Sequence, residues 1–335
     1  MLLSYQEMVD LGAQGLRASG ISTEAATETA QFLALAELDG IGSHGLSRVS
    51  QYAGHAMNGR IDANSKLMLT PFRSSAMRID AGDGLAFPAL RYGTDISVNL
   101  ASKTGIGIVA IKNSHHFGVA GHFTEAAARA GFISLLFGNT PAAMPMAGGR
   151  KPLFGTNPLA AAFPVKGKDP LVIDMSLSAV ARGKLLLADK NGQSIPLGWA
   201  LNSSGEPTTD PKEGLSGLML PLGGDKGALL AMIVELLVVG LSGSHFSYEA
   251  DSFFDPKGNR PRIGQLIITI DPGIAGVGMY AKKMTRFLKE LALDAGVRLP
   301  GQRRFNKRRI GFQEGVNVPD LIVEEIRAGI ARSWR

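Results

Sequence analysis

A histidine and an arginine stand four positions apart in the segment Ser43-His44-Gly45-Leu46-Ser47-Arg48. If Ser43 caps a helix, His44 and Arg48 share one face of that helix. Such a pair suits a small 2-oxo or 2-imino acid. The guanidinium can hold the carboxylate by a two-pronged hydrogen bond, and the imidazole can give a proton to the substituent on C2. The alternative is a capped helix with two solvated polar side chains, and the spacing alone leaves both interpretations open.

Two adjacent histidines, His115 and His116, lie in the segment from Asn113 to Ala120, between a predicted strand and a predicted helix. A metal site is one interpretation, but neighbouring side chains diverge, and the spacing does not aim His122 or Glu125 at this pair. The pattern favours a loop close to a ligand phosphate or a nicotinamide, and no metal is expected.

The segment Gly223-Gly224-Asp225-Lys226-Gly227 precedes an apolar stretch that begins at Ala228. Glycine-rich backbone entering a helix, with a lysine inside it, is typical of a site for phosphate or another anion. It is not a P-loop, because Gly227 stands where Ser or Thr would have to hold magnesium. A tight turn with an exposed lysine is the alternative.

A second glycine-rich segment, Gly105-Ile106-Gly107-Ile108-Val109-Ala110, matches the dinucleotide-binding pattern G-x-G-x-x-A. That pattern requires a strand before the glycines and a helix after them. Here the β-branched residues lie inside the match, so the glycines stand at the start of a strand. The sequence therefore does not support a Rossmann domain.

The composition bounds the class of protein. A chain of 335 residues with 45% hydrophobic residues fits about two domains. The absence of cysteine excludes disulfides, thiolate nucleophiles and Cys-ligated metal sites. Acidic residues at Glu7 and Asp10 argue against a signal peptide, and the apolar run from Ala228 to Gly243 carries Glu235 and is short for a bilayer span. We interpret that run as a buried helix and expect a cytoplasmic protein.

The formal charge is +6, and Arg303, Arg304, Lys307, Arg308 and Arg309 form a dense basic cluster. A nucleic-acid-binding protein is therefore a remote alternative. Aromatic residues make up only 7%, however, and no recognition module is visible. A positive surface that attracts an anionic cofactor and a carboxylate substrate accounts for the charge more simply.

Hydrophobic periodicity and capping residues predict helices near both ends of the chain and short strands between them. The predicted helices run from Ser4 to Gly20, Ala25 to Leu38, Ser43 to Met57, Phe123 to Ala130, from Ala228 onward, from Met279 to Ala295 and from Pro319 to Arg332. The predicted strands are Ile106 to Ile111, Ile133 to Phe137, Leu171 to Asp174 and Gln265 to Asp271. We expect residues 1–65 and 275–335 to form a helical domain and residues 66–274 to form an α/β cofactor-binding domain.

Taken together, several of these segments resemble one family, the type-2 malate/L-lactate dehydrogenases. The resemblance covers roughly residues 5 to 330 and rests on GSHGLSR, NSHHFGVAG, KPLFGTNPLA, VIDMSLSAVARGK, GEPTTDP, LPLGGDKGALLAMIVELL and LPGQRR. The family includes ureidoglycolate, sulfolactate and diketogulonate oxidoreductases and reductases of Δ1-piperideine- and Δ1-pyrroline-2-carboxylate. The resemblance implies an α/β (α+β) fold that is not a Rossmann fold, with a mostly antiparallel central sheet and a helical domain from both termini. It also implies a homodimer.

The resemblance also implies roles for individual residues. His44 matches the proton donor, Ser43 its hydrogen-bonding partner and Arg48 the carboxylate clamp, while His116 matches an alternative acid/base. Thr156 matches a substrate-contacting threonine, and Lys184 stands at a further substrate position. The expected cofactor contacts are His116, Phe117, Gly118, Val119, Ala120, Asp174, Met175, Ser176, Asp225, Lys226, Gly301, Gln302, Arg303 and Arg304.

The substrate and the cofactor remain divided between alternatives. Lys184 is typical of the hydroxy-acid members, whereas Phe246 to Glu249 and Phe253 to Asp255 resemble the imine-reducing branch. We favour NAD(P)H-dependent reduction of a cyclic 2-imino acid, to L-pipecolate or L-proline, over a 2-hydroxy acid dehydrogenase of the malate/L-lactate type. NADPH is slightly favoured over NADH, because Arg303 and Arg304 could hold a 2′-phosphate.

Overall fold

The computed structural model describes residues 1–334, and its centre is a seven-stranded mixed sheet with the order β2-β3-β4-β11-β5-β6-β7. Only β3 and β4 pair in parallel, and every other neighbouring pair is antiparallel. The strands are β2 (Met68–Arg73), β3 (Ala76–Asp80), β4 (Ile106–Ser114), β5 (Ile133–Gly138), β6 (Leu159–Phe163), β7 (Leu171–Met175) and β11 (Ile263–Ile270).

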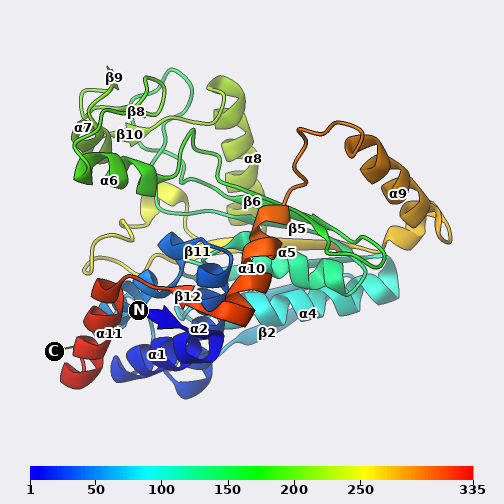
Figure 1. Cartoon of the computed structure of the whole chain (residues 1–335), viewed down its shortest axis with the longest axis horizontal. Helices are drawn as coiled ribbons and strands as arrows, with labels where there is room; N and C mark the ends of the chain where they lie inside the picture. The colour runs from blue at the N-terminus through cyan, green and yellow to red at the C-terminus, as the bar shows by residue number, and fades with distance from the viewer. Residues whose placement is uncertain (335) are drawn as a thin grey trace.

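Helices cover both faces of this sheet. Helices α4 (Ala86–Thr104) and α5 (Ala120–Arg129) pack on one face, and α8 (Asp225–Ser242) packs on the other (Figure 1). The central strand β11 is consequently buried along nearly its whole length, as expected for a strand that is covered on both sides. The strands predicted around residues 106–111, 133–137, 171–174 and 265–271 are confirmed as β4, β5, β7 and β11.

The two ends of the chain meet in a second, helical layer. It contains α1 (Tyr5–Ala18), α2 (Thr23–Leu38), α3 (Val49–Met57), α10 (Gln302–Glu314) and α11 (Asp320–Arg332). Helix α1 packs on α2, α3 and α11, and β1 (Leu2–Leu3) pairs with β12 (Val316–Asn317). The predicted capping box at Ser4 and Glu7 is confirmed. The division into two domains at residues 65 and 275 stays a prediction.

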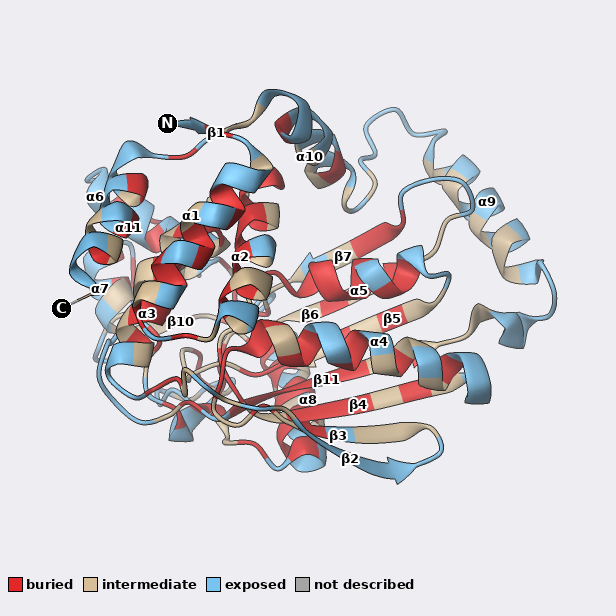
Figure 2. Ribbon diagram, turned by 90° about the horizontal axis from the view of Figure 1, so that it is seen from below, coloured by how far each residue is buried: buried red, intermediate tan, exposed pale blue. Residues whose placement is uncertain are grey.

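Two smaller units extend from these layers. One contains α6 (Arg182–Lys190), α7 (Pro211–Ser216) and a three-stranded sheet of β8 (Ala200–Leu201), β9 (Pro207–Thr208) and β10 (Leu218–Met219). The other is an arm with the 3-10 turn at Pro272–Ala275 and helix α9 (Met279–Leu291). Helix α9 contains no buried residue and projects from the sheet (Figures 1 and 2).

The predicted helix from Ser43 to Met57 is wrong at its start. Residues Gly42–His44 and Leu46–Arg48 form two 3-10 turns, and the α-helix begins only at Val49. Ser43 therefore caps no helix. Gly45 separates the turns, so His44 and Arg48 do not share a helix face as the four-residue spacing suggested.

Helices α4 and α10 are absent from the sequence prediction. Helix α4 has Pro88 in its first turn and Gly93 in its middle, and Gly93 allows close packing on Val109 and Ile267. Tertiary contact thus stabilises a helix of poor local propensity. Helix α10 lacks an apolar stripe, with only Phe305 and Gly311 buried, so no periodicity signals it.

Helix α8 is also less buried than predicted. Its inner side packs on the sheet, but Leu229, Ile233, Leu236 and Leu241 are exposed. No helix within residues 1–334 combines the length and the apolar character needed to cross a membrane.

Candidate active site

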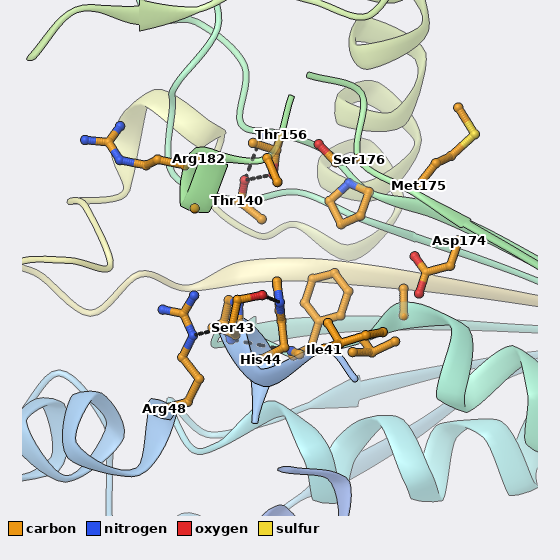
Figure 3. A pocket seen from close by; sticks show the side chains of 18 of the residues that line it. Ile41, Ser43, His44, Arg48, Thr140, Thr156, Asp174, Met175, Ser176 and Arg182 are labelled. Carbon is orange, nitrogen blue, oxygen red and sulfur yellow. Dashed lines mark hydrogen bonds between the residues drawn. The ribbon is translucent and has the colours of Figure 1, made fainter. Parts of the chain in front are cut away.

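A cavity of about 930 Å³ lies where the helical layer meets the sheet. Its wall contains residues of the two 3-10 turns, the loop between β4 and α5, the loop after β5, strand β7, and the segments 252–254, 298–301 and 303–304. Figure 3 shows that Arg48 and Arg182 lie toward one end of the cavity and Asp174, Met175 and Ser176 toward the other. The predicted site residues that line it are Ser43, His44, Arg48, His116, Phe117, Gly118, Val119, Ala120, Thr156, Asp174, Met175, Ser176, Gly301, Arg303 and Arg304.

Hydrogen bonds within the 3-10 turns orient His44 and Arg48. The Ser43 hydroxyl lies 3.0 Å from Nδ1 of His44, and Nε of Arg48 donates to the Ser43 carbonyl oxygen at 2.7 Å. Nη1 of Arg48 donates to Oε1 of Gln51 at 2.6 Å. The sharp turn therefore brings together the two groups that the sequence predicted on one helix face.

A buried carboxylate supports this turn from behind. Oε1 of Glu37 accepts the backbone N–H of Leu46 at 2.8 Å, and Glu37 is only 6% exposed. A Cβ on Gly45 would lie 2.1 Å from the same oxygen. Glycine is required at position 45 because of this close approach.

The electrostatic environment keeps His44 neutral at pH 7. Burial is the main cause, followed by repulsion from Arg48 and His122, and together they lower the pKa of His44 to about 4. The free pocket thus presents an uncharged imidazole next to a guanidinium.

His116 is the second histidine in the cavity wall. Its ring stacks on that of His44 with 5.5 Å between centroids, and the Tyr52 hydroxyl lies 2.6 Å from its Nδ1. Burial, together with repulsion from Arg48 and His44, holds the pKa of His116 well below its usual range. His115 points elsewhere, toward His55 at 2.9 Å between ring nitrogens, so the two adjacent histidines diverge as predicted.

Two threonines form the opposite wall. The backbone N–H of Thr156 donates to Oγ1 of Thr140 at 2.9 Å. The buried carboxylate of Glu235 accepts from Nδ2 of Asn157 at 2.8 Å and from the Ser247 hydroxyl at 2.7 Å, which anchors this wall. Sequence analysis missed Thr140, because Asn139-Thr140-Pro141 carries no pattern beyond an ordinary turn after β5.

A second arginine, Arg182, also reaches the cavity, and sequence analysis missed it. Its guanidinium carbon lies 5.1 Å from the centroid of the Phe254 ring, and that of Arg48 lies 5.9 Å from the same centroid. One nitrogen of Arg182 donates to the Leu215 carbonyl oxygen at 2.8 Å. The two guanidiniums therefore gather around one aromatic ring at one end of the cavity.

The other end combines a glycine in the left-handed conformation with cationic side chains. Gly118 has a φ of 65°, and Oδ2 of Asp174 accepts the Gly121 backbone N–H at 2.7 Å. Arg298 and Arg303 are exposed and line the cavity. Arg304 instead lies 3.2 Å from Glu125 and 3.3 Å from Asp39.

Four predicted site residues lie outside the cavity wall. They are Lys184, Asp225, Lys226 and Gln302, all of which are exposed. The Lys184 ammonium lies 5.8 Å from the Trp199 ring centroid. Helix α8 begins at Asp225, with Gly224 as its N-cap, so the glycine-rich segment does open a helix. Roles for these four residues stay predictions. Within residues 1–334 no group of three His, Asp or Glu side chains could hold a metal ion.

Comparison with known proteins shows close relatives along the whole chain. The family profile of malate/L-lactate dehydrogenase matches residues 3–327. The (2R)-3-sulfolactate dehydrogenase (NADP(+)) of Chromohalobacter salexigens is 45% identical over 98% of this chain and 97% of that protein. The Δ1-pyrroline-2-carboxylate/Δ1-piperideine-2-carboxylate reductase of Pseudomonas putida is 38% identical over 92% of this chain and 91% of that protein.

The fold agrees with these matches. The crystal structure of Δ1-piperideine-2-carboxylate reductase from Pseudomonas syringae superposes with a TM-score of 0.93 and 33% identity, over 98% of this chain and 99% of that one. The resemblance seen in the sequence is thereby confirmed. The chain belongs to the malate/L-lactate dehydrogenase family and is an oxidoreductase.

Proposed function

We propose that this protein transfers hydride between a nicotinamide cofactor and C2 of a small acid with two anionic groups, as a 2-hydroxy acid dehydrogenase. The observation that carries the choice of substrate is the pair of guanidiniums, Arg48 and Arg182, around the Phe254 ring. A carboxylate on Arg48 and a second carboxylate or a sulfonate on Arg182 would satisfy both charges. Malate and 3-sulfolactate have this chemistry, and the Chromohalobacter salexigens relative is named for the latter.

The residues of the cavity fit a nicotinamide dinucleotide outside any Rossmann unit. A volume of about 930 Å³ is at the upper end of that of ligand pockets and leaves room for a small acid beside the cofactor. Gly118 has no side chain to obstruct a cofactor at the cavity wall, and the exposed Arg298 and Arg303 offer charge to phosphates. When bound, the reduced nicotinamide supplies the hydride.

His44 supplies the proton and Arg48 holds the substrate. In the reduction, hydride reaches C2, the π-electron pair of the C=O bond moves to oxygen, and that oxygen takes a proton from His44. A neutral His44 must first become protonated. Burial is the main cause of the low pKa of His44, and repulsion from Arg48 is the second. An anion on Arg48 offsets that repulsion, so substrate binding favours proton uptake by His44. Ser43 orients the ring through Nδ1.

The test is a comparison of substrates by the absorbance of the reduced nicotinamide. We expect kcat/KM for 3-sulfopyruvate or oxaloacetate to exceed that for pyruvate and for Δ1-piperideine-2-carboxylate. Arg182→Met should lower kcat/KM for the dianionic acids about 10–100-fold and leave pyruvate nearly unaffected. Arg150→Met is the matched control, because Arg150 is exposed and its one ion pair within residues 1–334 is with Glu206.

Two outcomes would overturn the proposal. If Arg182→Met lowers kcat/KM equally for pyruvate and for the dianionic acids, Arg182 does not bind the second anionic group. Salt-sensitive binding to DNA, without turnover of any 2-oxo or 2-imino acid, would favour the nucleic-acid-binding alternative. Two arginines of the basic cluster, Arg304 and Arg308, form ion pairs with Asp39 and Glu125, which reduces the charge available for such binding.

The second candidate is the reduction of a cyclic 2-imino acid that the sequence favoured. The aromatic rings of Phe253 and Phe254 line the cavity and offer apolar surface to the methylene groups of such a ring. The relatives from Pseudomonas putida and Pseudomonas syringae are named for this reaction. A higher kcat/KM for Δ1-piperideine-2-carboxylate than for any 2-oxo acid would establish it.

A homodimer is part of the proposal, as the family resemblance implies. The arm exposes Ile274 and Val277 almost completely, along with Phe287 on α9, and α8 exposes Leu229 and Leu236. Large exposed apolar surfaces of this kind mark interfaces, and we assign this one to a second copy of the chain. Light scattering after gel filtration should give twice the mass of the chain, and Phe287→Glu should shift the protein toward the monomer. A wild-type protein with the mass of one chain would exclude the homodimer.

A further inference from the structure

The wall of the cavity contains two stacked histidines, and only one proton is needed at C2. His44 and His116 face each other with 24° between their ring planes. Phe253 closes the same corner, with its ring 5.4 Å from that of His116 at 83°. What each histidine can do depends on which of its ring nitrogens carries hydrogen, and for His116 the neighbouring atoms decide this.

Two donors meet at Nδ1 of His116. The Gly118 backbone N–H donates to this atom across a long contact of 3.4 Å, and a backbone amide can only donate. The Tyr52 hydroxyl lies 2.6 Å from the same atom and makes no other hydrogen bond within residues 1–334. Tyr52 is fully buried in α3. Nδ1 therefore carries the lone pair, and in a neutral imidazole the hydrogen then resides on Nε2.

The surroundings of the ring oppose a second proton. A hydrogen on Nδ1 would point at the Gly118 N–H and would turn the Tyr52 hydroxyl away from its acceptor. The titratable or charged groups around the ring are Arg48, His44, His115, His55 and Tyr52, and none of them is an anion at pH 7. Burial raises the pKa of Tyr52 above its usual value, so the hydroxyl keeps its hydrogen.

We propose that Tyr52 is a positioning residue that locks His116 in the neutral tautomer with hydrogen on Nε2, so that His116 is a fixed hydrogen-bond donor to the C2 substituent and not a proton donor. The proposal rests on the hydride transfer at C2 described above. His116 gains and loses no proton in the reaction. His44 alone gives a proton to the oxygen or nitrogen on C2, and Nε2–H of His116 stabilises the charge that develops there.

Substitutions at His116 separate a donor from an acid/base. The side-chain amide of glutamine can place an N–H near the position of Nε2 but cannot exchange a proton at neutral pH. We expect His116→Gln to retain kcat within about tenfold of wild type, whereas His116→Ala should lose about 10²-fold to 10³-fold, the cost of one preorganised donor. The shape of the pH profile of kcat/KM should be the same in wild type and His116→Gln. If His116→Gln is as inactive as His116→Ala, or loses a limb of the profile, the proposal is overturned.

The tautomer can be measured without turnover. In wild type, the ¹⁵N spectrum of the histidine side chains should show His116, identified by its loss in His116→Gln, with Nδ1 unprotonated and Nε2 protonated from pH 6 to pH 8. In Tyr52→Phe the signals should move toward a mixture of tautomers, and kcat should fall about tenfold, the value of one hydrogen bond. Tyr5→Phe is the matched control, because Tyr5 lies in α1 and packs on Phe312 away from the cavity.

The outcomes distinguish this inference from the proposed function. A spectrum with hydrogen on Nδ1, or one unchanged by Tyr52→Phe in a variant with a native thermal transition, overturns the role of Tyr52 whatever the substrate. Failure to reduce any 2-oxo or 2-imino acid overturns the proposed function and leaves the tautomer measurement intact.

Discussion

At the scale of single residues, the site works through differences between groups of the same type. Nδ1 of His44 lies beside the Ser43 hydroxyl, a group that can donate or accept, whereas Nδ1 of His116 has a backbone donor. Among the arginines, Arg48 and Arg182 gather at one end of the cavity, Arg303 is exposed, and Arg304 is paired with acids. Residue type alone therefore does not identify function, because the partner of each group determines what it can still do.

The first prediction concerns His44, the proposed proton donor. His44→Ala should lower kcat by about two to four orders of magnitude, the usual effect of losing a general acid. The KM for the cofactor should stay nearly unchanged, because the proposed role of His44 is to give a proton to the substrate and not to hold the cofactor. Steady-state kinetics with NADPH as the varied substrate measure both constants. Near-normal turnover by this variant would transfer the role to His116.

The second prediction separates Arg303 from Arg304. Arg303 is free to meet a 2′-phosphate, so Arg303→Ala should raise the KM for NADPH about tenfold or more and leave that for NADH unchanged. Arg304→Ala should instead lower the free energy of unfolding by about 1–3 kcal/mol. The substitution removes one of the two arginines of α10 that pair with Asp39 and Glu125, and only Arg308 of that helix then remains beside these acids. Steady-state kinetics of both variants with NADPH and with NADH test the first expectation, and urea unfolding of both variants tests the second. An unaltered NADPH/NADH ratio in Arg303→Ala would contradict the assignment.

At the scale of elements, the double 3-10 turn between α2 and α3 is what creates the site. It replaces the first turn of a helix, and the carboxylate of Glu37 at the end of α2 holds its shape. In this turn Gly45 lies so close to Glu37 that a Cβ there would stand 2.1 Å from Oε1. The element is thus specified by one buried acid and one glycine.

The third prediction tests this element. In Gly45→Ala the new Cβ would lie 2.1 Å from Oε1 of Glu37, so the turn must move. We expect kcat to fall with little change in the KM for the cofactor, and the free energy of unfolding to fall by about 1–3 kcal/mol, as in other overpacked sites. Gly240→Ala is the control, because Gly240 lies in α8 with open space at its Cβ position, and alanine there favours the helix. A Gly45→Ala enzyme of normal activity would show that the turn tolerates displacement.

At the scale of the whole molecule, many imidazoles are kept neutral in the folded protein. The pKa values of His44, His55, His115, His116 and His122 are all lowered, in each case mainly by burial. The unfolded chain therefore binds protons at a higher pH than the folded one does.

The fourth prediction follows from this difference. Histidines contribute stability that is fully present above the unfolded pKa of 6.5 and is lost as the pH falls toward the folded value, about 4 for His44 and His55. The free energy of unfolding should fall by about 1 kcal/mol or more per pH unit between pH 6 and pH 5. Urea unfolding at constant ionic strength from pH 8 to pH 5 measures it. A free energy of unfolding that stays constant over this range would contradict the prediction.

The sequence by itself determined the central strands, the capped terminal helices and the family, because these depend on local patterns: β-branched runs, Ser4 with Glu7, and contiguous motifs such as the one from Ser43 to Arg48. Periodicity could not reveal α4 or α10. Helix α4 is stabilised by packing of Gly93 on the sheet, and α10 turns arginines inward toward acids from α2 and α5.

Only the tertiary structure decided which charged and polar groups meet. Thr140, Arg182 and Tyr52 contact the site from segments far apart in the chain, and no local signal marks them. Packing also determines the different environments of Arg303 and Arg304. Both line the cavity, but successive residues of a helix point in different directions. Arg303 is therefore exposed, whereas Arg304 is paired with Asp39 and Glu125. Sequence patterns encode elements and their faces, whereas the distance between two side chains on different elements exists only once the chain has packed.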